Sequence, residues 1–219
     1  SRESRRSMDS TERRVIGIAG PAGAGKTSLV HALAERLEDA VVIHYDHYER
    51  ATQEPIDRLA QWIQAGADVN DIRLPELARD LDALKHGDPV IHPLTRRALT
   101  PGRHIIFETP LGREHRETGR YIDLLLWIDV PLDVALARKV REFASVVLAR
   151  KDPRNALDFL AWLHTYLEHY LGGIHDLMDL QRDRIRTRAD RIIDGNRAFE
   201  TVLLEALMSV TGDPSGGRS

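Results

Sequence analysis

The sequence predicts an α/β fold, with a five-stranded parallel sheet flanked by helices and a small helical lid. Three observations support this prediction. Short apolar runs alternate with segments whose apolar residues recur at helical spacing. A glycine-rich turn follows the first apolar run, and carboxylates end two of the others. Alternating strands and helices favour parallel pairing with helices on both faces, and ligands then bind beyond the carboxyl ends of the strands.

The five expected strands are short and mostly apolar, as buried parallel strands are. They are Val15–Ala19, Val41–Tyr45, His104–Glu108, Asp123–Asp129 and the short run from Asp190 to Gly195.

The expected helices are amphipathic segments between these strands. One begins at Lys26, one at Pro55, one at Asp152-Pro153 with a kink or break at Gly172-Gly173, and others cover Leu74–Leu84, Leu132–Arg150 and Phe199–Val210.

Composition limits the class of protein. The chain has 219 residues, a net charge of −3 with both signs interspersed, and no cysteine. This excludes disulfides and thiolate metal sites, and it does not indicate a nucleic-acid partner. No apolar run reaches the roughly 20 residues of a membrane helix. We expect a cytoplasmic protein without a membrane partner, and a homo-oligomer is left open.

The expected domains are a disordered arm (1–13), a catalytic domain (14–211, with a lid near 138–154 and an acceptor-side insert near 50–100) and a disordered tail (212–219).

The glycine-rich turn matches the phosphate-loop pattern GxxxxGK[ST], also called Walker A, between a strand and a helix. Glycines let backbone N–H groups turn toward phosphate oxygens, and the helix N-terminus favours the same anion. The pattern predicts a nucleoside triphosphate bound with Mg²⁺ in a P-loop NTPase fold, and it does not distinguish a kinase from a GTPase, an ATPase motor or a ligase. The expected nucleotide-binding residues are Gly20, Pro21, Ala22, Gly23, Ala24, Gly25, Lys26, Thr27 and Ser28. Lys26 is expected to reach the terminal phosphates, and Thr27 to ligate the metal.

Two carboxylates are expected opposite the phosphates. Asp46 follows the second strand, where it can take a proton from a substrate hydroxyl or hold Mg²⁺. Glu108 ends the third strand and can support the same metal site. The alternatives are a solvated loop or helix cap for Asp46 and a cap for a helix beginning near Pro110 for Glu108. Two histidines flank Asp46, too few for a transition-metal site.

Arginines on the helix after the fourth strand are candidates for the lid. Phosphoryl transfer spreads negative charge over the moving group, and Arg138 and then Arg141 are the expected cations that close over it. A solvated helix face is the alternative for each.

Several landmarks in this order resemble the uridine kinase and phosphoribulokinase group of P-loop kinases, the uridine kinase-like branch in particular. They are Gly20–Thr27, Tyr45-Asp46-His47-Tyr48, Lys85-His86-Gly87-Asp88-Pro89-Val90, Ile105–Glu108, Arg138–Arg141 and Arg188-Ala189-Asp190. The resemblance implies a P-loop fold of the nucleoside or nucleotide kinase type and a kinase that transfers a phosphoryl group from ATP to a hydroxyl, with Asp46 as general base.

The acceptor side departs from that resemblance. After Pro93, the tyrosine-aspartate pair and the histidine-x-arginine of uridine kinases are absent, so the nucleoside-reading segment is altered. Tyr48, His92, Arg96 and Arg97 are the expected acceptor-side residues. The predicted function is an ATP- and Mg²⁺-dependent kinase acting on a small metabolite. The alternatives are a nucleotide-dependent regulatory ATPase and a nucleoside monophosphate kinase.

Overall fold

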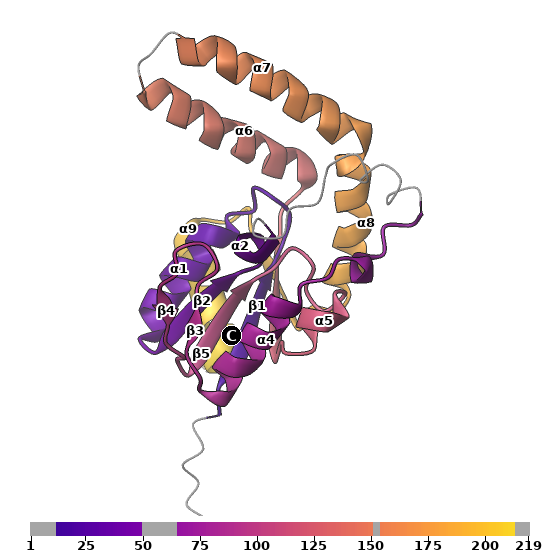
Figure 1. Cartoon of the computed structure of the whole chain (residues 1–219). Helices are drawn as coiled ribbons and strands as arrows, with labels where there is room; N and C mark the ends of the chain where they lie inside the picture. The colour runs from indigo at the N-terminus through magenta and orange to yellow at the C-terminus, as the bar shows by residue number, and fades with distance from the viewer. Residues whose placement is uncertain (1–11, 50–64, 151–153, 213–219) are drawn as a thin grey trace, which may run out of the picture.

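The computed structural model describes residues 12–49, 65–150 and 154–212. The expected helix at Pro55 and most of both predicted terminal segments lie outside these residues. Five parallel strands form the main sheet in the order β2-β5-β1-β6-β7 (Figure 1). Their bounds are Arg14–Ala19 (β1), Ala40–His44 (β2), His104–Glu108 (β5), Leu124–Asp129 (β6) and Arg191–Asp194 (β7). The predicted five-stranded parallel sheet is confirmed.

Helices cover both faces of this sheet (Figure 1). On one face, α1 (Lys26–Leu37) and α9 (Phe199–Thr211) pack on the inward side chains of β1, such as Ile16 and Ile18. On the other face, α4 (Pro75–His86) buries Leu77, Leu81 and Leu84 against Val15 and Phe107. Successive side chains of a strand point to opposite faces, which is why neighbouring residues of β1 enter two separate cores.

Three further helices extend from the domain (Figure 1). α6 (Leu132–Ala149) runs away from the sheet, and α7 (Arg154–His169) returns beside it. A contact between aromatic rings joins the two helices, since the tilted rings of Phe143 and Trp162 lie 4.3 Å apart between their centroids. The expected break at Gly172-Gly173 is confirmed: Tyr170–Ile174 interrupts the helix at Gly173, with φ 148°, and α8 (His175–Arg186) follows.

Five short elements complete the fold of the described residues, and the sequence patterns did not predict them. They are α2 (Tyr45–Glu49), the 3₁₀ turn η2 (Val69–Asp71), α5 (Arg116–Gly119) and the hairpin of β3 (Val90–Ile91) with β4 (Ala98–Leu99). Segments this short carry little periodicity. Among the described residues, no helix is both long and apolar enough to cross a lipid bilayer.

Candidate active site

The phosphate loop joins β1 to α1 at the carboxyl edge of the sheet. Gly25 precedes the helix in the left-handed conformation, with φ 85°. Gly23 has φ 89°, and a Cβ atom added to it would lie 2.1 Å from the carbonyl oxygen of Ala135 in α6. Only glycine combines this backbone angle with so close an approach. The loop is therefore packed directly against the first turn of α6.

Lys26 begins α1 and folds back over the loop. Its Nζ donates to the carbonyl oxygens of Gly20, at 2.8 Å, and Pro21, at 2.9 Å. Burial lowers the pKa of Lys26, the carboxylates of Glu108 and Asp46 act in the opposite direction, and the charge of Lys139 lowers it further. The two carboxylates and the second lysine are thus close enough to act electrostatically on Lys26.

Thr27 and Glu108 contact each other across the site. The Thr27 hydroxyl donates to Oε1 of Glu108 at 2.9 Å, and Nδ1 of His44 lies 2.5 Å from Oε2. Burial raises the pKa of Glu108, but hydrogen bonds from His44 and Thr27 and the charge of Lys26 outweigh it, so the net shift is downward. Glu108 is therefore a carboxylate with both oxygens engaged.

Asp46 lies on α2, the short helix that follows β2. The second strand was expected to end at Tyr45, which was wrong by one residue. β2 ends at His44, the last residue in register with β5, and Tyr45 already begins the helix. The exposed Asp46 still faces Thr27 and Glu108. All three line an open cleft of about 400 Å³, together with Val42, His31, His44, His47 and His92.

Hydrogen bonds indicate which ring nitrogen of His92 carries the proton in this cleft. The backbone N–H groups of Leu94 and Thr95 donate to Nδ1 of His92. This nitrogen is an acceptor, so the proton of the neutral ring is on Nε2, which lies 2.9 Å from Nδ1 of His47. Burial lowers the pKa of His92, and the charge on His44 adds to this, which favours the neutral ring. His92 therefore holds the His47 ring on the wall of the cleft.

Three other expected acceptor-side residues are not on this wall. Tyr48 is only 3% exposed, and its hydroxyl donates to the buried carboxylate of Asp80 at 2.8 Å, which places it in the core. Its helical position turns it away from Asp46, because neighbouring residues of a helix do not share a face. Arg96 and Arg97 are exposed at the turn between β3 and β4.

The lid cations differ in what they contact. Arg138 donates to the carbonyl oxygen of Gly195 at 3.0 Å, beyond β7. Arg141 is exposed on α6. Lys139, which the sequence reasoning missed, is the cation of α6 whose charge reaches Lys26. Its Nζ lies 3.4 Å from Oε2 of Glu142, further along the same helix.

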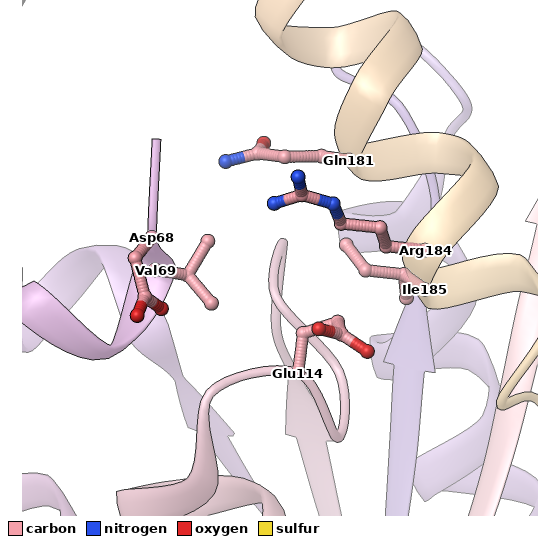
Figure 2. A pocket seen from close by; sticks show the side chains of 6 residues that line it. All are labelled: Asp68, Val69, Glu114, Gln181, Arg184 and Ile185. Carbon is pink, nitrogen blue, oxygen red and sulfur yellow. The ribbon is translucent and has the colours of Figure 1, made fainter. Parts of the chain in front are cut away.

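A second cavity lies between α8 and the loops before α4 and α5 (Figure 2). Its lining residues are Asp68, Val69, Glu114, Gln181, Arg184 and Ile185. Its volume of about 20 Å³ has room for roughly one water molecule, so it is too small for a metabolite. The alternative role of Glu108, as a cap for a helix beginning near Pro110, does not agree with the structure, because residues 110–115 form bends and turns and α5 begins only at Arg116.

The oxygen donors of the cleft fit a magnesium nucleotide. Mg²⁺ prefers oxygen ligands and is usually held by one or two carboxylates together with phosphates and waters. A hydroxyl (Thr27) and two carboxylates (Asp46 and Glu108) provide such donors beside the phosphate loop. No cluster of three or more histidine and acidic side chains in the described ranges has the arrangement of a metal cage.

The fold and the loop define a P-loop protein, and the relatives found by sequence comparison are uridine kinases. The chain is 27% identical to uridine kinase of Borreliella burgdorferi over 138 residues, 58% of this chain and 66% of that protein. The match thus spans just under two thirds of that relative. This chain is also 23% identical to uridine kinase of Lactobacillus helveticus over 193 residues, which are 82% of this chain and 85% of that relative. The chain is a distant homologue of uridine kinases.

Solved structures give weaker likenesses. Shikimate kinase of Acinetobacter baumannii in complex with shikimate aligns at a TM-score of 0.49 and 18% identity, covering 93% of this chain and 96% of that one. A possible uridine kinase from Bacillus stearothermophilus aligns at a TM-score of 0.40 and 18% identity, covering 60% of this chain and 79% of that one. No family model matches the chain.

Proposed function

We propose that this chain is a kinase that uses ATP and Mg²⁺ to phosphorylate a hydroxyl group of a small metabolite. The observation that carries the proposal is the convergence of Thr27, Asp46 and Glu108 on one cleft beside Lys26. A phosphate loop alone would suit any protein that binds a nucleoside triphosphate. A carboxylate facing the same cleft adds what transfer to an alcohol needs.

The proposed roles follow from these positions. The loop from Gly20 to Ser28 binds the phosphates, with Lys26 exchanging its carbonyl partners for phosphate oxygens. Thr27, Glu108 and Asp46 would hold Mg²⁺, which neutralises charge on the phosphates when bound. Asp46 accepts the proton of the attacking hydroxyl, and Arg138 and Arg141 are the proposed lid arginines.

The described wall of the cleft suits a small hydroxylated acceptor. Its side chains are imidazoles, carboxylates, one hydroxyl and one aliphatic group, Val42. Imidazoles and carboxylates can form hydrogen bonds with the hydroxyl groups of such an acceptor. His92 is the proposed acceptor-side residue that the cleft retains. Sugars and polyols are therefore the first acceptors to test, and nucleosides the comparison.

Substitution of Asp46 tests the proposal. With an acceptor found by screening, ATP and Mg²⁺, Asp46→Asn is expected to lower turnover by about a hundredfold or more, because it removes the base. Calorimetric binding of ATP should persist. Asp88→Asn, an exposed carboxylate after α4, is the matched control. Normal turnover in Asp46→Asn would refute the base. ATP hydrolysis with no phosphorylated product from any acceptor would instead favour the regulatory ATPase.

A further inference from the structure

We infer that the buried hydrogen bond between Tyr48 and Asp80 aims the carboxylate of Asp46 into the cleft, which makes Tyr48 and Asp80 positioning residues of the active site. The inference rests on the proposed role of Asp46 as general base. It extends that role to two residues that are not among the described residues lining the cleft. Tyr48 lies on α2, two residues after Asp46, and Asp80 lies on α4.

The helix that carries the proposed base is too short to keep its own orientation. α2 has five residues, whereas isolated helices of fewer than about 12 residues are marginal in water, so contacts with other elements must hold it. Tyr45 and Tyr48 lie three positions apart on one face, and both are buried. Asp46 is exposed and lies about 200° around the helix from Tyr48. The face that anchors α2 is therefore opposite the face that presents the carboxylate.

The two tyrosines anchor α2 in different ways. The Tyr45 ring meets the ring of His115 edge-on, at 6.4 Å between centroids, and its hydroxyl has no hydrogen-bond partner in the part of the chain that the structure describes. The Tyr48 hydroxyl donates to Oδ2 of Asp80 at 2.8 Å. A hydrogen bond restricts both distance and angle, whereas a ring contact tolerates sliding. The bond of Tyr48 is thus the contact of this face that limits rotation of α2.

Asp80 is well placed as a fixed acceptor. Its side chain is only 8% exposed, and a buried carboxylate is costly unless it is paired. Nε and Nη2 of Arg79 donate to Oδ1 at 3.2 Å, so both oxygens of Asp80 are engaged. Burial raises the pKa of Tyr48, and the hydrogen bond and charge of Asp80 raise it further, so the hydroxyl remains a donor. Hydrogen bonds to a carboxylate are about twice as strong as neutral ones.

The helix that carries Asp80 is itself fixed on the sheet. Leu77, Leu81 and Leu84 of α4 are fully buried in the core that covers this face. The bond from Tyr48 therefore ties a short helix to a rigid one. On the far side of α2, Asp46 shares the cleft with Thr27 and Glu108. Displacement of a reacting group by about 1 Å can cost about a hundredfold in rate, so this tie bears on catalysis.

The test is a double-mutant cycle on Tyr48 and Asp80, with three measurements. With ATP, Mg²⁺ and an acceptor found by screening, Tyr48→Phe and Asp80→Ala should each lower kcat by about tenfold or more. Calorimetric affinity for a β,γ-imido analogue of ATP should stay within about twofold. The double variant should be no slower than the slower single variant, because the two residues act as one unit. Deuterium uptake by residues 41–49 should rise in all three variants.

Two further variants separate positioning from stability. In Asp80→Asn the amide oxygen can still accept from Tyr48, so kcat and deuterium uptake should recover most of the wild-type values. Leu84→Ala is the matched control, because it removes a fully buried side chain one turn further along α4 and leaves both partners of the bond in place. Its kcat should stay within about twofold of wild type.

An unchanged kcat in folded Tyr48→Phe overturns the inference, even if Asp80→Ala does not fold. Losses that add in the double variant, or an equal loss in Leu84→Ala, also overturn it. If the wild-type chain phosphorylates no acceptor, the proposed function fails, and hydrogen exchange alone then decides the anchoring. Increased uptake confined to residues 41–49 in Tyr48→Phe supports it, and unchanged uptake refutes it.

Discussion

His44 and Glu108 are register partners at the carboxyl ends of β2 and β5, and His44 Nδ1 lies 2.5 Å from Oε2 of Glu108. Both side chains are largely buried, with 11% and 14% of their surfaces exposed. A carboxylate held on one oxygen by His44 and on the other by Thr27 has little freedom to rotate. The pair therefore fixes the direction in which Glu108 faces the cleft.

The first prediction concerns this pair. His44→Ala should lower turnover with Mg²⁺ and ATP by about tenfold or more, because partners of metal-binding carboxylates typically contribute that much. His44→Asn should recover much of the loss, since its amide can donate from nearly the position of Nδ1. Steady-state kinetics over a range of Mg²⁺ concentrations measures both variants. Equal turnover in wild type and His44→Ala would show that Glu108 needs no such support.

A second prediction concerns the contact between the phosphate loop and α6. Gly23→Ala should destabilise the fold by about 1–3 kcal/mol from backbone strain alone, and further from the clash with the Ala135 carbonyl. Gly66→Ala is the matched control, because Gly66 has a similar φ of 98° but no heavy atom within 4 Å of the added Cβ. Urea unfolding compares the two. If both variants lose the same free energy of unfolding, the contact with Ala135 contributes nothing.

A third prediction follows from Asp190, the landmark aspartate before β7. Its Oδ2 accepts from Nη2 of Arg113 and from the backbone N–H of Leu125, both at 2.7 Å. Burial raises the pKa of Asp190, but these hydrogen bonds and the nearby charges lower it below its ordinary value. A carboxyl whose pKa is lowered in the folded state stabilises the fold above its ordinary pKa, and this contribution disappears as pH falls through the lowered value.

Asp190→Asn should therefore cost about 1 kcal/mol near neutral pH, a modest loss because the carboxylate is 41% exposed. The difference between variant and wild type should shrink below about pH 4. Thermal unfolding from pH 3 to pH 8 measures it. A difference that is constant over this range would show that the charge of Asp190 is not what stabilises this edge of the sheet.

The residues proposed to bind the nucleotide could be predicted from the sequence, whereas most of the residues around the proposed acceptor could not. The loop pattern is contiguous, so its glycines and Lys26 identify themselves without knowledge of the fold. Glu108 was predicted at the end of a strand, and the structure places it there. The orientation of Tyr48 was not predictable, because Tyr45 starts a helix of only five residues that has no periodicity to read. The pairing of His92 with His47 joins residues 45 positions apart.

By itself, the sequence determined the parallel α/β sheet, the phosphate loop and the strand-end carboxylates, because local backbone chemistry and the alternation of apolar runs specify these. Only the tertiary structure decided that His44 holds Glu108, that Tyr48 enters the core, and that α6 packs on Gly23 of the phosphate loop. Each of these depends on a contact between separate elements. Packing sets such contacts through the register of β2 on β5 and the close approach of α6 to Gly23, which no local pattern encodes.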